Sequence, residues 1–320
     1  MNLRCTILDD YQGAALSMAD WSPVSDKVDL QVFREHIARE DELVTALEQS
    51  DIIVAMRERT PFRKSLLQRL PNLKLLITTG KRNPSIDVPF AIEQGVVVCG
   101  TDGSSNATSE LAWALILGLA KNLLAENTAL QKRGPWQSTI STDLSGSTLG
   151  ILGLGRIGSQ VAQIGRAFGM DVIAWSQNLT TEQAESVGAR LALSKEALLR
   201  ESDFVSIHLV LGDRTRGLIG EKELNLMKRS AYLINTSRSA IVDQTALLHA
   251  LKDGLIAGAG LDVFDVEPLP DDDPFRSLHN VLATPHIGYV SKITYRAWFP
   301  QVVENIEAYL AGSPIRLLDP

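Results

Sequence analysis

Short apolar runs rich in β-branched residues alternate with amphipathic stretches along the first hundred residues of the chain. This alternation is typical of βαβ units, in which helices connect parallel strands. Strands are predicted at Cys5–Leu8, Asp29–Phe33, Ile52–Val54, Leu73–Thr78 and Val96–Val98. Helices are predicted at Glu40–Glu48, Pro61–Leu70 and Pro89–Glu93. The first part of the chain therefore predicts a small, doubly wound α/β domain.

A second and more regular alternating series begins at Ser147. Its strands are predicted at Leu149–Leu152, Asp171–Trp175, Phe204–Leu209, Ala231–Asn235, Ala257–Val263 and Val281–Thr284. Six parallel strands with intervening helices fit a complete dinucleotide-binding sheet.

One helical stretch precedes the second series and another follows it. A loop of turn-forming residues, 100–106, precedes a long helix that is predicted to start near Thr108. The chain ends in a helical stretch, Ile293–Leu310, which is closed by Gly312 and Pro314. If the apolar face of this last helix packs on the first domain, the chain crosses back and the first domain is discontinuous.

Composition and charge narrow the classes of function. The chain of 320 residues is long enough for two domains, and its 45% hydrophobic and 22% charged residues are those of an ordinary globular protein. A net charge of -7 counts against binding to nucleic acid or to an anionic membrane surface. The most apolar run, Leu111–Ala120, is shorter than the roughly 20 residues that a membrane span needs.

The N-terminal residues and the cysteines favour a cytoplasmic protein. The apolar stretch after Met1 is soon interrupted by Asp9 and is too short for a signal peptide. Cys5 and Cys99 make no disulfide framework and are predicted to be reduced thiols. No metal site is expected.

The most informative motif follows the first strand of the second series. Residues 150–158 read Gly150-Ile-Leu-Gly153-Leu-Gly155-Arg156-Ile157-Gly158, a G-x-G-x-x-G turn that opens a helix. The first glycine allows a tight turn, the second lets the backbone approach a pyrophosphate, and the third lets helix and strand pack closely. The motif predicts a dinucleotide site at the N-terminus of the helix.

The residue at the end of the next strand bears on the choice of cofactor. NAD-binding chains usually have Asp or Glu there for the ribose hydroxyls, whereas this chain has Ser176. Ser176 does not repel a 2′-phosphate, so NADP is admissible. However, residues 176–184 contain no Arg or Lys to pair with that phosphate, which favours NAD.

Three polar residues follow strands of the second series, and they are Arg238, Glu267 and His286. Taken singly, each has an ordinary interpretation as a surface or loop residue. Ligands bind at the carboxyl ends of parallel strands, so the three side chains are expected to converge. Reduction of a 2-keto acid needs a cation for the carboxylate, a proton donor for the carbonyl oxygen and a hydride from a cofactor. Arg238 and His286 supply the first two, and a carboxylate such as Glu267 would orient the imidazole and favour its cationic form.

With these residues the chain resembles the D-isomer-specific 2-hydroxyacid dehydrogenases, among them glyoxylate/hydroxypyruvate reductases and phosphoglycerate dehydrogenases, over nearly its whole length. The resemblance rests on four ordered motifs, which are Gly150–Gly158, Leu233–Arg238 with Val242-Asp243, Leu261–Phe264 with Glu267-Pro268, and Thr284–Ile287.

The resemblance implies roles for individual residues. Arg238 would bind the substrate carboxylate and carbonyl, His286 would be the general acid/base, and Glu267 would be its partner. Asp262 would contact the nicotinamide amide, and Thr236 would lie along the cofactor.

The resemblance also implies an architecture. Residues 1–104 and 292–320 would form a discontinuous, flavodoxin-like substrate domain, and residues 105–291 an NAD(P)-binding Rossmann domain. A homodimer built on the second domain is expected, with a small 2-keto or 2-hydroxy acid as substrate. The lack of a regulatory domain after Leu310 disfavours regulated phosphoglycerate dehydrogenases, and Glu267 disfavours formate dehydrogenases, which have glutamine there.

The chain departs from the family at Ser176 and at two other places. The loop 79–84 contains Gly80, Lys81 and Arg82 where the family more often has a glycine-rich run that leads to the acid at Asp87. These residues are candidates for substrate binding, and their charge would suit a larger or doubly charged acid such as a phosphorylated one. Tyr289 replaces a small residue after His286 and could narrow the pocket.

Two other functions remain open from the sequence. A dinucleotide-sensing binding protein, similar to the C-terminal-binding corepressors, can keep all three polar residues, although no disordered tail or evident docking segment supports this hypothesis. An unrelated Rossmann enzyme could match the family by chance. The sequence names neither the acid nor the direction of the reaction.

Overall fold

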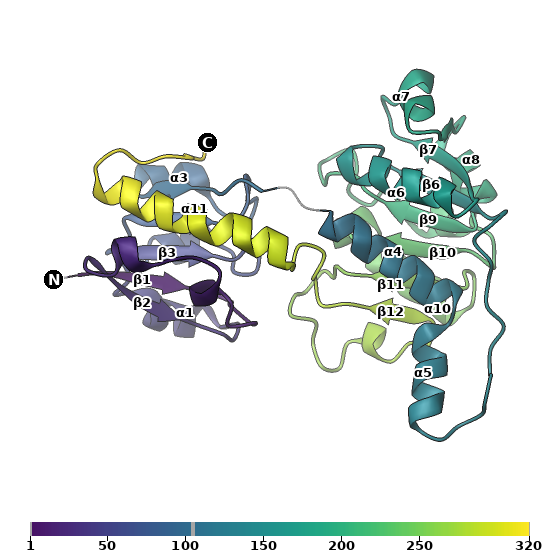
Figure 1. The fold of residues 1–320 in the computed structure, drawn as a ribbon, viewed down its shortest axis with the longest axis horizontal. Coiled ribbons are helices and arrows are strands. Elements are labelled where there is room, and N and C mark those ends of the chain that lie inside the picture. Colours follow the sequence, from purple (N-terminus) through teal and green to yellow (C-terminus); the bar gives the residue numbers. More distant parts are fainter. Residues whose placement is uncertain (1, 104–105, 320) are drawn as a thin grey trace. The chain divides into compact units, whose positions relative to one another are not determined.

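The computed structural model describes residues 2–103 and 106–319. The chain divides into two compact units: unit 1 comprises Met1–Ser105 and Val290–Pro320, and unit 2 comprises Asn106–Tyr289. Each unit is built on a parallel sheet with helices on both faces (Figure 1), which confirms the predicted fold class. The predicted boundary between residues 104 and 105 lies outside the described residues.

Unit 1 contains a five-stranded sheet. Its strands are β1 (Leu3–Ile7), β2 (Val28–Val32), β3 (Ile52–Ala55), β4 (Leu75–Thr78) and β5 (Val97–Cys99). They are all parallel and lie in the order β2-β1-β3-β4-β5, which is the flavodoxin-like order. Each one matches a predicted strand, and only the end residues differ.

Helices cover both faces of this sheet. One face packs on α1 (Glu40–Leu47), α2 (Lys64–Leu67) and α3 (Val88–Glu93), whose leucines and alanine join the strands in one apolar core. The long helix α11 (Lys292–Leu310) contacts β4 and the short 3-10 helix η2 (Ser22–Val24); η1 (Ala15–Ser17) precedes η2. Because α11 comes from the end of the chain, unit 1 is discontinuous in sequence (Figure 1).

The helix predicted at Pro61–Leu70 is shorter than expected. Phe62 forms a bridge with Ile86 and donates its N–H to the carbonyl of Ser85, and Arg63 is extended. The helix therefore begins only at Lys64. Local pattern does not predict this, because the partner strand segment lies more than twenty residues away.

Unit 2 contains a seven-stranded sheet rather than the predicted six strands. Its strands are β6 (Thr148–Leu152), β7 (Asp171–Trp175), β8 (Arg190–Leu191), β9 (Phe204–Ile207), β10 (Tyr232–Asn235), β11 (Gly258–Leu261) and β12 (Val281–Ala283). They are parallel in the order β12-β11-β10-β9-β6-β7-β8, a Rossmann order. The additional strand, β8, has two residues and is too short to give a pattern in the sequence.

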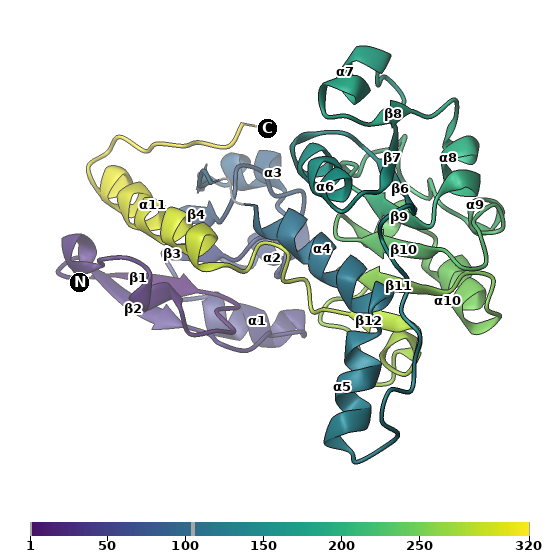
Figure 2. The same ribbon diagram turned by 45° about the vertical axis from the view of Figure 1, so that its right-hand side comes forward.

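Two apolar cores cover the faces of the second sheet, and Figure 2 shows the helices that flank this sheet. Helices α4 (Ala107–Ala120) and α6 (Arg156–Ala167) pack on one face. Helices α8 (Lys195–Glu201), α9 (Glu221–Leu224) and α10 (Gln244–Lys252) pack on the other. The remaining helices are α5 (Leu123–Gln131), α7 (Thr181–Ser186), η3 (Ser239–Ile241) and η4 (Pro274–Arg276). The strand order reverses between β6 and β9, which is where ligands bind in such sheets.

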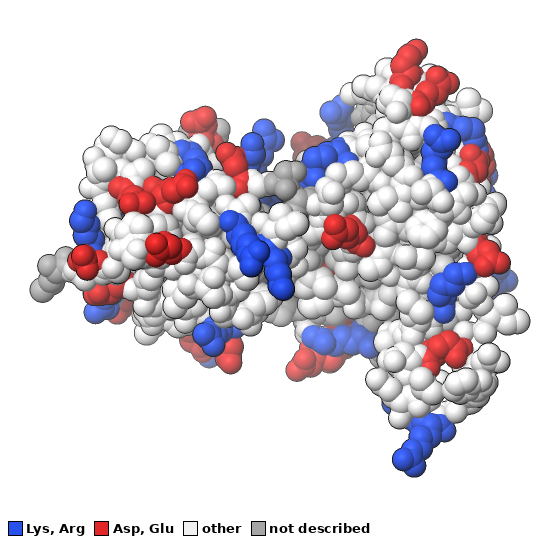
Figure 3. Space-filling view, viewed as in Figure 1, with Lys and Arg blue, Asp and Glu red and all other residues white. Residues whose placement is uncertain are grey.

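Acidic and basic side chains are interspersed over the face of each unit that Figure 3 shows. In the part of the chain that the structure describes, no helix is both long and apolar enough to cross a membrane.

Candidate active site

The glycine turn connects β6 to α6 at the point where the strand order reverses. Gly153 has a φ of +96°, and a Cβ there would lie 2.8 Å from the carbonyl oxygen of His208 on the neighbouring strand connection. A Cβ at Gly158 would lie 2.0 Å from the carbonyl oxygen of Gly153. The first and third glycines are therefore required by the protein's own packing.

The second glycine has a different role. A Cβ at Gly155 would meet no atom within 4 Å, and its backbone is extended with a φ of -77°. Any residue can adopt this conformation, so the fold itself does not require glycine there. Gly155 leaves open space at the N-terminus of α6, where the backbone can approach a pyrophosphate.

A cleft of about 450 Å³ adjoins this turn within unit 2. Its lining residues are Gly153, Leu154, Gly155, Ser159, Ser176, Asn178, Leu179, Gln183, Ser186, Val187, His208, Leu209 and Val210. None of these lining residues is charged. The cleft therefore has polar and apolar walls, but neither an acid for the ribose hydroxyls nor a cation for a 2′-phosphate.

His208 lines the cleft directly after β9. Its Nε2 lies 2.9 Å from the hydroxyl of Ser206, whereas its Nδ1 is buried without a hydrogen-bond partner among the described residues. Burial lowers the pKa of His208 to about 4, because the charged ring would lose its hydration. The ring is therefore neutral at physiological pH, and Nδ1 can accept or donate one hydrogen bond.

Thr236 follows β10 and is buried, with a hydroxyl that also has no partner among the described residues. Buried hydroxyl groups are normally hydrogen-bonded. Together with His208 Nδ1 and the open space at Gly155, this hydroxyl fits a site for a bound dinucleotide.

Glu267 and His286 form the closest acid–base pair in unit 2's candidate site. Oε2 of Glu267 lies 2.6 Å from Nδ1 of His286, and Oε1 accepts the N–H of Phe264 at 2.8 Å. Both side chains are partly exposed, at 22% for His286 and 32% for Glu267. Tyr289 packs edge-on against the imidazole, with ring centroids 5.5 Å apart. The carboxylate is fixed at one oxygen and holds the ring with the other.

Asp262 comes directly after β11 and is buried. It accepts hydrogen bonds from the Thr284 hydroxyl and from the N–H groups of Ile287 and Gly288, at 2.6 to 2.8 Å. Burial raises the pKa of Asp262, and these three hydrogen bonds oppose that rise.

Arg238 comes after β10, at the start of η3. The side-chain amide of Asn235 donates to the Arg238 carbonyl at 3.0 Å and accepts from the N–H of Ser237. The guanidinium donates to the carbonyl of Ser237 at 2.8 Å. Arg238, Glu267 and His286 thus all follow strands at the carboxyl edge of one sheet.

The predicted substrate loop lies at the carboxyl end of β4 in unit 1. Gly80 has a φ of +112°, and a Cβ there would lie 1.9 Å from the guanidinium of Arg57. Lys81 is exposed and pairs with Asp102 at 3.0 Å, which offsets part of its charge. Arg82 is exposed, and its carbonyl accepts from Arg57.

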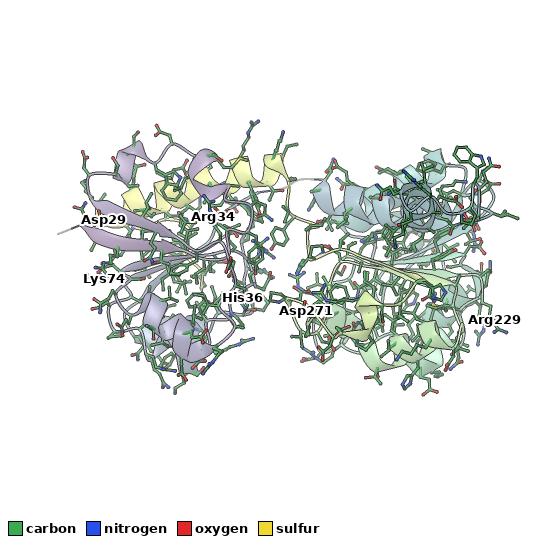
Figure 4. All side chains as sticks on the ribbon, turned by 90° about the horizontal axis from the view of Figure 1, so that it is seen from below. Asp29, Arg34, His36, Lys74, Arg229 and Asp271 are labelled. Carbon is green, nitrogen blue, oxygen red and sulfur yellow. The ribbon has the colours of Figure 1, made fainter. Side chains whose placement is uncertain are left out.

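The sequence around His36 is typical of an exposed helix or loop, but this histidine is largely buried. Its side chain is only 16% exposed, and Nδ1 lies 3.0 Å from Oδ1 of the buried Asp9. The hydroxyl of Thr60 donates to Oδ2 of the same carboxylate at 2.6 Å. His36 follows β2 in unit 1 (Figure 4) and serves a buried polar network there.

Sequence reasoning missed three residues that support these groups, namely Arg57, Asn235 and Thr284. Asn235 carries a recognisable signal, since an Asn followed two residues later by Ser often forms a side-chain-capped turn. Thr284 stands in the motif Thr284–Ile287, but the motif does not show its contact with Asp262, which follows the neighbouring strand. Arg57 carries no such signal.

The sequence of the chain is similar to a known family profile and to several known enzymes. Residues 113–288 match the profile of the D-isomer specific 2-hydroxyacid dehydrogenase, NAD binding domain. The glyoxylate reductase of Aeropyrum pernix is 42% identical over 257 residues, which cover 77% of this chain and 76% of that protein.

Two solved structures are similar over almost the whole chain. Phosphoglycerate oxidoreductase from Vibrio cholerae O395 has a TM-score of 0.92 and 36% identity, with 97% of this chain and 100% of that one covered. D-lactate dehydrogenase from Aquifex aeolicus, complexed with NAD and lactic acid, has a TM-score of 0.77 and 27% identity, with 96% of each chain covered. The names of these relatives differ in the acid.

Proposed function

Because the chain belongs to the D-isomer specific 2-hydroxyacid dehydrogenase family, we propose that it interconverts a small 2-keto acid and its D-2-hydroxy acid with Arg238, Glu267 and His286. The chain carries the NAD-binding domain of that family, and NAD is its cofactor. The identity of the acid and the roles of the three residues are the proposal.

The contacts of His286 define its proton chemistry. Because Nδ1 is bonded to Glu267, the ring exchanges its proton through Nε2. In reduction, Nε2–H protonates the carbonyl oxygen as the carbonyl carbon gains a hydride, and the ring is left neutral. In oxidation, the neutral Nε2 takes the hydroxyl proton. The bound nicotinamide supplies the hydride chemistry.

Arg238 supplies the cation that an acid substrate needs. A guanidinium can hold a carboxylate through two parallel hydrogen bonds, which fixes the 2-carbon beside the proton donor. The Asn235 side chain holds the Arg238 backbone, so the guanidinium starts from a defined position.

The observation that carries the proposal is the 2.6 Å contact between His286 and Glu267, whose other oxygen is fixed on the N–H of Phe264. An ordinary loop histidine has no need of a carboxylate that is itself anchored. This arrangement orients a ring for proton transfer.

Spectrophotometric turnover tests the proposal. Purified protein is incubated with NADH or NADPH and with glyoxylate, hydroxypyruvate, phenylpyruvate or phosphohydroxypyruvate, while loss of reduced cofactor is followed. We expect turnover with at least one acid and loss of it in His286→Ala. NADH binding without turnover on an extended panel of 2-keto acids would overturn the proposal in favour of a dinucleotide sensor.

For the cofactor, we propose a preference for NAD over NADP. The support is the uncharged lining of the cleft, in which Ser176 and Asn178 stand where a 2′-phosphate would need a cation. The NADH to NADPH ratio of kcat/KM in the same assay measures this preference.

The loop after β4 is proposed to bind the anionic part of the substrate. The loop contains two cations, Lys81 and Arg82, next to Gly80. The guanidinium of Arg57 lies against Gly80. Because Lys81 already pairs with the exposed Asp102, its contribution is expected to appear mainly with an acid that carries a second negative charge.

The quaternary state proposed is a homodimer whose contact surface includes the arm 123–140. Helix α5 has no buried residue, and Trp136 and Ile140 are 79% and 97% exposed in the single chain. Apolar side chains gathered on one projecting segment favour burial against a second copy. Light scattering should give a dimer for the natural chain and a monomer for the Trp136→Ser, Ile140→Ser double variant. A monomeric natural chain would contradict the proposal.

Both cysteines are buried free thiols, as expected for a protein of the reducing cytoplasm, which is the location we propose. Fractionation of the source cells tests it.

A further inference from the structure

The loop that carries His286, residues 284–288, has an unusual backbone. His286 has a φ of +51°, in the left-handed region that favours glycine. A residue with a Cβ stays in that region only where its surroundings hold it there. The hydrogen bonds of this loop therefore decide where the imidazole lies.

Asp262 accepts three of those hydrogen bonds. Oδ1 accepts from the Thr284 hydroxyl at 2.6 Å and from the N–H of Ile287 at 2.8 Å, and Oδ2 accepts from the N–H of Gly288 at 2.8 Å. The carboxylate thus contacts the loop before and after His286. A Cβ at Gly288 would lie 3.0 Å from Oδ2, so the loop packs tightly on the carboxylate.

The other side of the loop is held from α4. The hydroxyl of Thr108 donates to the carbonyl of Gly288 at 2.9 Å. Gly288 is thereby fixed through both its N–H and its carbonyl, and the loop has little freedom to shift as a body.

The position of the loop matters because Glu267 is anchored independently. Glu267 is bound to the N–H of Phe264, so it cannot follow a displaced imidazole without losing that bond. A hydrogen bond of 2.6 Å between His286 and Glu267 forms only when both side chains keep their positions relative to each other.

We propose that Asp262 is a positioning residue, which acts on His286 through the backbone of residues 284–288 and keeps Nδ1 of the ring on Glu267. The inference rests on the proposed function only where it concerns catalysis. Asp262 would position His286 even in the protein without cofactor, whereas a contact with the nicotinamide amide would have an effect only when the cofactor is bound.

The variant Asp262→Asn separates these roles. A carboxylate accepts at both oxygens, whereas the amide of Asn has one oxygen and one NH₂ group. In either orientation the NH₂ group faces a backbone N–H, of Ile287 or of Gly288, and one hydrogen bond becomes a repulsion. The size of the side chain is unchanged, so the loop is disturbed without a cavity.

The measurement is the ¹⁵N NMR spectrum of the imidazoles in the full chain without cofactor, at a pH where the rings are neutral. These shifts report which ring nitrogen carries the proton, and His286→Gln assigns the signal. The natural protein is expected to show His286 with the proton on Nδ1, because Nδ1 donates to Glu267. In Asp262→Asn we expect a mixture with the Nε2–H form, and in Glu267→Ala the loss of the Nδ1–H preference.

A second pair of variants keeps the test valid if Asp262→Asn does not fold. Thr284→Ser retains the hydroxyl and should behave as the natural protein. Thr284→Val removes one of the three hydrogen bonds and should give a smaller shift toward Nε2–H than Asp262→Asn.

An unchanged Nδ1–H signal in Asp262→Asn, combined with weaker NADH binding by calorimetry, would overturn the inference and leave Asp262 as a cofactor contact. A shifted signal supports it. Because neither readout needs turnover, failure of the proposed reaction would appear separately, as the absence of activity with an intact Nδ1–H signal.

Discussion

The α-carbon of Gly158 faces the carbonyl oxygen of Gly153 so closely that a Cβ at residue 158 would lie 2.0 Å from that oxygen. At Gly155, between them, a Cβ would meet no atom within 4 Å. Two glycines of one motif are therefore needed for different reasons. Gly158 is required by packing within the protein, and Gly155 leaves space for a ligand.

This contrast gives a matched pair of variants. Gly158→Ala should lower the free energy of unfolding by about 1–3 kcal/mol, because the turn must shift to admit the methyl group. Gly155→Ala should leave that free energy almost unchanged and weaken NADH binding. Urea unfolding and calorimetric titration with NADH measure the two effects. Equal destabilisation by both variants would show that Gly155 is also a packing glycine.

The neutral state of His208 should appear in the pH dependence of stability. Its pKa is lowered to about 4 in the folded protein, from 6.5, so the unfolded chain takes up the proton first as the pH falls. At neutral pH and above, both states are neutral and the group contributes nothing. Between pH 6.5 and 4, the free energy of unfolding should fall by up to about 1.4 kcal/mol per pH unit through this group.

The control for His208 is His208→Gln, whose amide can keep the contact with Ser206 and does not titrate. The difference in unfolding free energy between the natural chain and this variant should change with pH only below about 6.5. A pH-independent difference would contradict the buried neutral ring.

Removal of the proton-transfer pair should affect turnover far more than folding. His286→Ala is expected to lower kcat by about 10²–10⁴-fold, since a general acid/base is lost. Glu267→Gln should lower kcat less, because Nδ1 can still donate to the amide oxygen while the anion is lost. Thermal melts serve as the folding control, and near-full turnover of His286→Ala with an unchanged pH profile would exclude its proposed role.

A cation introduced into the cleft should improve the use of NADPH. In Ser176→Arg, a charge-assisted hydrogen bond to the 2′-phosphate is worth about 1.5–3 kcal/mol, or roughly tenfold or more in kcat/KM for NADPH. Gln177→Arg is the matched control, because it adds the same charge next to Ser176 at a residue that does not line the cleft. Equal gains from both variants would point to a general charge effect.

The cations of the substrate loop should distinguish singly from doubly charged acids. Lys81→Ala and Arg82→Ala are expected to raise KM for phosphohydroxypyruvate by about tenfold, which corresponds to about 1.4 kcal/mol, and to change KM for glyoxylate little. Lys252→Ala, an exposed lysine at the end of α10, is the control. The same rise for both acids would show that the loop binds the carboxylate common to them.

The sequence determined the two sheets and the glycine turn. The periodicity of strands and helices and the G-x-G-x-x-G spacing are local properties of the sequence. They can therefore be recognised without knowing which distant segments pack against them. The ends of elements were less well determined: β9 was predicted to reach Leu209 but ends at Ile207, where its neighbours β6 and β10 also stop pairing.

Only the tertiary structure decided which polar side chains work together. The contact of Asp262 with the nicotinamide amide, which the family resemblance implies, stays a prediction, and the structure adds that both its oxygens bind a loop more than twenty residues away. His36 lies in a stretch whose sequence is typical of an exposed helix or loop, and its side chain instead pairs with Asp9 from the adjacent strand connection. The reason is that the order of parallel strands brings their carboxyl ends together, and that order depends on packing between distant segments rather than on any local pattern.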